Sequence, residues 1–111
     1  MNQREIMMKI QWPAMVKFED IDELVFVGSQ QLWDTDTNLS SAGFQVGDRL
    51  IDAIGGVYEL DMGVSPTDES LTLEQVLELV QQHASVCGQC CVSKMDVPSI
   101  YEAIKLVEHI E

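Results

Sequence analysis

The chain has 111 residues, of which 46% are hydrophobic and 23% are charged, which suffices for one well-packed domain and argues against disorder. Acidic residues outnumber basic ones by 19 to 6, and the net charge of −13 argues against nucleic acid and anionic membranes as partners. No apolar run approaches the roughly 20 residues of a membrane span, and no signal-peptide pattern opens the chain. We therefore expect a single cytoplasmic domain over residues 1–111, with a loose N-terminal tail at residues 1–7.

Two strands that form a hairpin are the first predicted elements. Apolar residues alternate with mostly polar ones over residues 8–18, the period of a strand with one buried and one solvated face. The expected buried side chains are Met8, Ile10, Trp12, Ala14, Val16 and Phe18. Because Pro13 cannot donate to a ladder, we expect this strand at a sheet edge or with a bulge. A turn at residues 19–22 leads to a second strand over residues 23–27.

A short helix and an acidic loop follow the hairpin. Ser29 can cap a helix over residues 30–34. The stretch Asp34–Asn38 matches the first three ligand positions of a calcium loop, D-x-D-x-N. Leu39 then replaces the required glycine and Gln45 the bidentate glutamate, so we expect a polar loop rather than a calcium site.

A second hairpin is predicted from two apolar runs, at residues 49–54 and 57–62. Gly55 and Gly56 separate these runs, and tight hairpin turns need residues that accept positive φ. The next stretch, residues 63–70, contains a proline and two acidic residues, and it is predicted as an acidic connecting loop.

Two long helices are predicted from their capping boxes. Thr72 with Gln75 opens the first helix, and Ser99 with Glu102 opens the second. Apolar residues recur at helical spacing after each box: Leu73, Val76, Leu77, Val80, Ala84 and Cys87 in the first helix, and Ile100, Ala103, Ile104, Val107 and Ile110 in the second.

The order of these elements predicts an α+β domain. Gly88 can end the first long helix, and residues 89–97 are predicted as a late strand. Two hairpins and this strand give one mainly antiparallel sheet of about five strands, with the two long helices packed on one face. If the late strand runs parallel to its neighbour, the crossover should be right-handed.

The three cysteines offer a candidate redox or metal site. Cys87 and Cys90 have C-x-x-C spacing, but Cys87 is predicted at a helix C-terminus, where the dipole disfavours a thiolate. A zinc site needs four converging ligands. His83 shares a helix face with Cys87, and His109 could arrive from the last helix. Cys90 and Cys91 are strand neighbours that point to opposite faces, so only one of them could join.

Short strings along the chain resemble a small family of bacterial proteins of unknown function. They are Ile10-Gln11-Trp12-Pro13-Ala14, Asp22-Glu23-Leu24, Leu50-Ile51-Asp52 and Gln89-Cys90-Cys91-Val92. The resemblance covers most of the chain and implies a free-standing bacterial cytoplasmic protein. It implies no catalytic or binding residue.

Our leading hypothesis is a non-catalytic acidic domain that acts through protein–protein contacts, with a basic protein as its partner. The sequence leaves a homo-oligomer open. The alternative is a thiol- or metal-binding protein that uses His83, Cys87 and either Cys90 or Cys91. A third reading, an enzyme with paired loop carboxylates, has no pair that the sequence singles out. We therefore assign no catalytic residue, cofactor or metal ligand. Trp33, beside the acidic loop, suits either a protein-binding patch or a lid on the core.

Overall fold

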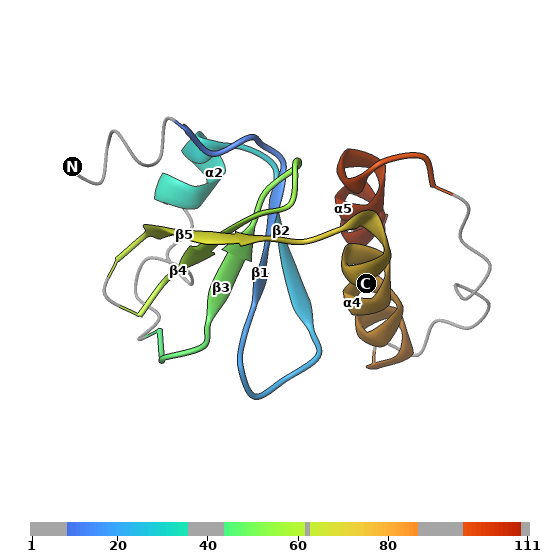
Figure 1. Ribbon diagram of the computed structural model, residues 1–111, viewed down its shortest axis with the longest axis horizontal. Coiled ribbons are helices and arrows are strands. Elements are labelled where there is room, and N and C mark those ends of the chain that lie inside the picture. The colour runs from blue at the N-terminus through green and yellow to red at the C-terminus, as the bar shows by residue number, and fades with distance from the viewer. Residues whose placement is uncertain (1–8, 36–43, 62, 87–96, 110–111) are drawn as a thin grey trace.

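The computed structural model describes residues 9–35, 44–61, 63–86 and 97–109, and the statements below concern that part of the chain (Figure 1). It contains one five-stranded antiparallel sheet, two long helices and one short helix. The strands are β1 (Ala14–Lys17), β2 (Leu24–Val27), β3 (Arg49–Ile51), β4 (Gly56–Glu59) and β5 (Ser65–Ser70), and the helices are α2 (Gln30–Thr35), α4 (Leu73–Val86) and α5 (Ile100–His109). The strands lie in the order β2-β1-β3-β4-β5, and each neighbouring pair is antiparallel. The predicted α+β fold class is confirmed.

The first hairpin forms as predicted, but β1 is not an edge strand. It lies between β2 and β3, and Met15 stands opposite both Phe26 and Ile51. The expectation of an edge or bulge was wrong because Pro13 precedes the strand, so its missing N–H is not required by the ladder.

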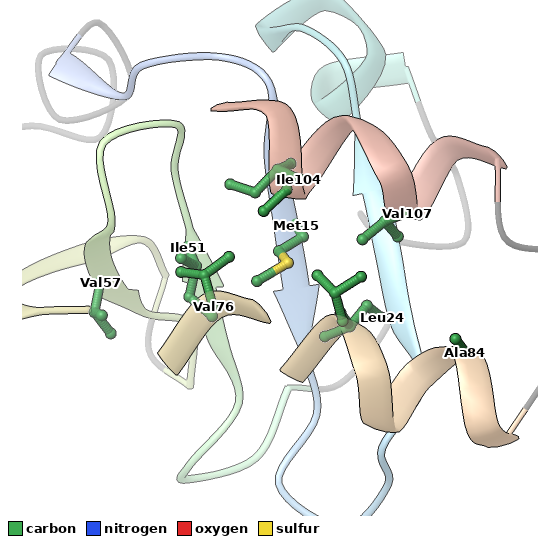
Figure 2. Packing of buried hydrophobic residues seen from close by; sticks show 10 residues of the cluster. Met15, Leu24, Ile51, Val57, Val76, Ala84, Ile104 and Val107 are labelled. Carbon is green, nitrogen blue, oxygen red and sulfur yellow. The ribbon is translucent and has the colours of Figure 1, made fainter. Parts of the chain in front are cut away.

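Both faces of β1 are buried, so the solvated face expected for this strand is also wrong. On one side, β1 packs beneath α4 and α5, and Figure 2 shows Met15 among Ile51, Val76 and Ile104. The buried residues of this helix-side core are Met15, Leu24, Ile51, Val57, Val76, Val80, Ala84, Ala103, Ile104 and Val107. On the other side, Trp33 of α2 and Phe44 help to cover a second core of Ile10, Ala14, Val16, Val27, Leu50, Leu60 and Val64.

The alternation of β1 therefore identified a genuine core face, but the long helices cover the opposite one. Trp12 and Phe18 pack against the second core, which contains Ile10, Ala14 and Val16 of the predicted face. On the helix side, Lys17 is buried along its stem while its ammonium donates to the carbonyl oxygens of Phe18 and Ile21. A lysine is therefore compatible with this buried face, because its ammonium group is hydrogen-bonded by carbonyl oxygens of the β1–β2 loop while its methylene stem is buried.

The second hairpin is confirmed, with shorter strands than predicted. The turn between β3 and β4 begins at Asp52, whose backbone N–H donates to Gly56 O at 3.0 Å. Gly55 has a φ of +85°, and a Cβ there would collide with the carbonyl oxygen of Leu71. Glycine is therefore required at Gly55 by both its backbone conformation and this close approach.

The predicted loop at residues 63–70 is instead a strand. β5 pairs with β4 through Tyr58–Pro66 and Glu59–Ser65, with an irregularity between Gly56 and Tyr58. Proline and acidic residues are tolerated because β5 has a partner on only one side within the described sheet. Most of the predicted late strand at residues 89–97 lies outside the described residues, and Val97 is not in a strand.

The helices begin where their caps predict. Thr72 Oγ1 accepts the Gln75 N–H at 3.2 Å, and Gln75 Oε1 accepts the Thr72 N–H at 2.9 Å. Ser99 Oγ accepts the Glu102 N–H at 3.2 Å, and the short helix α2 has Ser29 at its cap, accepting from Leu32 N at 3.2 Å. These bonds satisfy N–H groups that have no partner within their own helix.

Met15 offers a test of the doubly buried strand. We expect Met15→Ala to lower the free energy of unfolding by about 2–5 kcal/mol, because it leaves a cavity between β1, β3 and the two long helices. Urea denaturation measures the loss. Val46→Ala, at a side chain that is 80% exposed, is the control and should change stability by less than about 0.5 kcal/mol. Equal effects would contradict the burial described for β1.

Candidate functional site

His83, the one predicted ligand of the thiol or metal site within the described residues, is buried in the structure. Its Nδ1 accepts the backbone N–H of Leu24 at 2.9 Å, so α4 is tied to the start of β2. With Nδ1 accepting this bond, the proton of the neutral ring lies on Nε2, so this tautomer offers no lone pair to a metal ion. Cys87, Cys90 and Cys91 lie outside the described residues, as does most of the calcium-like stretch, residues 36–38.

Metal-ligand groupings can be sought only where side chains are described. No group of three or more His, Cys, Asp or Glu side chains that could hold a metal ion occurs among those residues. His109 belongs to α5, and its side chain lies outside the description. The grouping of His83 with the cysteines therefore stays a prediction.

Two buried aspartates are the most enclosed acids in the described chain, and both are engaged by backbone N–H groups. Asp52 is fully buried and accepts from Ile54 N at 3.1 Å, Gly56 N at 2.8 Å and Gln11 N at 3.1 Å. It therefore fixes the β3–β4 turn and ties the segment before β1 to that turn. A carboxylate whose oxygens are held by three N–H groups is suited to a structural role.

Asp48 does the same at the opposite end of the sheet. Its Oδ1 accepts from Glu19 N at 2.9 Å and its Oδ2 from Gln45 N at 2.8 Å. It thereby joins the β1–β2 loop to the turn before β3. The sequence analysis assigned no role to Asp48 or Asp52. Their roles depend on N–H groups of other segments, which only the folded structure places beside them.

An acidic cleft lies beside Asp48, at the end of the sheet that α4 and α5 leave uncovered. Its lining consists of Glu19, Val46, Gly47, Arg49, Glu59, Asp61 and Glu69, around a space of about 340 Å³. The carboxylates come from the β1–β2 loop, β4, the segment after β4, and β5. Four carboxylates against one guanidinium give this acidic cleft a negative potential, which its concave shape concentrates.

Arg49 lies at the boundary of the acidic cleft. It also lines a second, shallower depression next to α4 that contains Glu78. The Nε atom of Arg49 is buried and has no hydrogen-bond partner, and no carboxylate of the described chain forms an ion pair with Arg49. No ion pair with this cation therefore neutralises a carboxylate of the acidic cleft within the described chain.

The two tryptophans contribute to packing, and one also reaches the surface. Trp33 stacks on Phe44 with ring centroids 6.1 Å apart and packs against the second core, which favours the lid interpretation. Trp12 packs against the same core and also lines an open groove with Phe26 and Tyr101.

A comparison with known protein families identifies the family of this chain. Residues 12–107 match the DUF4144 family, described as a protein structure with unknown function, and the chain belongs to this family. The resemblance noted from the sequence, to a small family without known function, is confirmed.

A solved structure shares the fold: the NMR structure of a protein from Shewanella amazonensis is similar over 93% of this chain and 91% of that one. The two are 27% identical, with a TM-score of 0.73. A comparison with curated proteins found no match. Among the described residues, none of the helices has both the length and the apolar character needed to cross a membrane.

Asp52 provides the first test of these assignments. Asp52→Asn keeps the shape but replaces one acceptor oxygen with a donor, so a buried N–H group loses its partner. We expect the free energy of unfolding to fall by about 2–3 kcal/mol in urea denaturation. Asp68→Asn, at an exposed carboxylate of β5, is the matched control and should be almost neutral. A neutral Asp52→Asn would refute the structural role of this carboxylate.

Tyr58 provides a pH test of the same region. Burial, and secondarily the negative charge of Asp52, raise the pKa of the Tyr58 phenol above its ordinary 10.0. In the Tyr101→Phe background, the ultraviolet absorbance titration reports Tyr58 alone, and its midpoint should lie above pH 10.

The linked effect on stability has a defined sign. Folding favours the neutral phenol, so the stabilising contribution of Tyr58 is fully present at pH values below the pKa that Tyr58 has in the unfolded chain. This contribution is lost as the pH rises through the higher pKa that Tyr58 has in the folded protein. Tyr58→Phe should remove that loss, and a midpoint at or below the ordinary value would refute the proposed environment.

Proposed function

We propose that this member of the DUF4144 family is a non-catalytic domain that binds a basic segment of another protein in the acidic cleft. The observation that carries the proposal is the convergence of Glu19, Glu59, Asp61 and Glu69 on one concavity. Glu19 is forty residues from Glu59 in the sequence, and the fold gathers it with Glu59, Asp61 and Glu69 around an opening that no residue of α4 or α5 lines.

The chemistry of the acidic cleft favours lysine or arginine side chains. Carboxylates accept charge-assisted hydrogen bonds from ammonium and guanidinium groups. Val46 is exposed at the rim and offers apolar surface to the methylene stem of such a side chain. The lining contains four carboxylates and one cation, Arg49, so the net charge of the cleft is negative.

The non-catalytic part of the proposal is supported by the buried acids. Both carboxylate oxygens of Asp48 and of Asp52 accept backbone N–H groups, which suits these residues to holding turns. The cleft carboxylates lie at an open surface, where screened electrostatics gives moderate affinity and fast association. Such a site is suited to reversible docking.

A lysine hexapeptide tests the acidic cleft. In an amide NMR titration at low salt, we expect shifts centred on Gly47, Glu59, Asp61 and Glu69, because binding should place the ammonium groups between these carboxylates. The affinity should fall as salt is added, since exposed charge pairs are screened.

Charge-neutralising variants supply the control for this titration. We expect the double variant Glu59→Gln with Asp61→Asn to weaken peptide binding about tenfold, or about 1.4 kcal/mol. Asp22→Asn with Glu23→Gln removes the same net charge from exposed positions outside the acidic cleft and should weaken binding far less. Equal losses in the two double variants would refute the cleft as the docking site.

A further inference from the structure

A second surface, at the β2 edge of the described sheet, has a different chemistry from the acidic cleft. It is an open groove of about 390 Å³ lined by Trp12, Pro13, Phe26, Gly28, Ser29, Leu32, Tyr101, Lys105 and Glu108. The groove crosses β2, which contacts both α2 and α5 (Figure 1). Leu32 is 54% exposed and Tyr101 45% exposed, so large apolar side chains face solvent here.

The groove coincides with an edge of the sheet that His83 of α4 covers at Leu24 and that carries no charge or proline. β2 has a strand neighbour on one side only in the described sheet. The edge at the other end, β5, contains Pro66, Asp68 and Glu69, residue types that discourage strand addition. β2 has the sequence LVFV, without charge or proline, which favours pairing with another strand.

The hydrogen-bonding side of β2 can be derived from His83. The N–H of Leu24 donates to His83 Nδ1 and therefore points away from β1. Backbone groups of alternate residues in a strand point the same way, so the N–H and C=O of Phe26 also face outward. Phe26 lines the groove, and the outward backbone groups and the exposed apolar side chains are therefore adjacent.

The charge of the groove indicates which partner fits. Lys105 Nζ lies 5.9 Å from the Phe26 ring centroid and 3.8 Å from Glu108, and the lining contains one basic and one acidic residue. The groove is thus formally neutral on a chain with a net charge of −13. Two copies of such a chain repel each other least through this surface, and a rim with one cation and one anion is complementary to itself.

We propose that the groove is occupied by a second copy of this chain, with the end of β2 pairing antiparallel to the end of β2 of the partner across a two-fold axis near Val27. In this register Phe26 faces Gly28 of the partner subunit, and Leu24, whose N–H is held by His83, lies outside the paired residues. The acidic β1–β2 loop of each copy then lies away from the same loop of the other copy. The pairing extends the sheet and buries Leu32 and Tyr101.

This inference does not depend on the proposed binding of a basic segment, because it rests on a different surface. The two also respond oppositely to salt. Screening should weaken binding of a basic peptide, whereas it should strengthen self-association by reducing repulsion between two acidic chains. Failure of one is therefore distinguishable from failure of the other.

Sedimentation velocity of the full chain over a concentration series tests the proposal. We expect the mass to rise from the 12.4 kDa of one chain to twice that value, at lower concentration when salt is added. Leu32→Glu and Tyr101→Glu should each raise the concentration of half-association roughly tenfold or more. Val46→Glu makes the same change at an exposed residue in the acidic cleft and should have little effect.

Hydrogen exchange of the Phe26 amide locates the contact. We expect this amide to exchange quickly in dilute protein and slowly where the mass has doubled, because pairing gives its N–H an acceptor. A chain that keeps the single mass at every concentration and salt would overturn the proposal. So would equal effects of Leu32→Glu and Val46→Glu, or a doubled mass without protection of Phe26; the last would place the contact on another face.

Discussion

The burial of β1 on both faces is the constraint on which the rest of the structure depends. Met15 packs beneath the two long helices, while Val16 packs into the second core on the other side. Neither face of β1 therefore meets water: α4 and α5 cover one face, and Trp33 and Phe44 help to cover the other. The ammonium group of the buried Lys17 therefore needs hydrogen-bond acceptors, and two backbone carbonyl oxygens, those of Phe18 and Ile21, supply them.

This layering also decides where the surface sites lie. Helix α5 packs over β1 and β2, and α4 packs against α5, whereas neither helix lines the opening near Glu59 and Asp61. Carboxylates from four segments surround that opening. At the opposite edge, α5 and α2 flank β2 without covering it, which leaves a neutral apolar groove. One sheet thus presents an acidic concavity and an apolar edge to different kinds of partner.

The sequence predicted those parts of the fold that are determined locally. Thr72 with Gln75, and Ser99 with Glu102, placed both helix starts because capping depends on residues three apart. The β3–β4 hairpin was found from Gly55 and Gly56. Local patterns failed where the deciding contact was distant. β5 was taken for a loop because its tolerance of Pro66 follows from its place in the sheet, and the burial of Met15 follows from helices far along the chain.

The candidate sites could be predicted from the sequence less well than the fold. The sequence predicted an acidic protein-binding surface from net charge alone, without locating it. Glu19, Glu59 and Glu69 meet only through strand pairing, and no spacing rule joins them. Asp48 and Asp52 likewise acquire their roles from backbone N–H groups supplied by other segments. The outward direction of the backbone N–H and C=O of Phe26 follows from the hydrogen bond between Leu24 and His83, which the sequence does not reveal.

The central claim is that the acidic cleft receives the cationic side chains of a partner. Carbodiimide coupling tests it most directly, because this reagent joins an amine to a carboxylate only where the two are in contact. With a lysine hexapeptide at low salt, followed by peptide mass spectrometry, the account predicts coupling concentrated on Glu59, Asp61 and Glu69. Coupling spread evenly over the exposed carboxylates, with Asp22 and Glu23 modified as often, would contradict it.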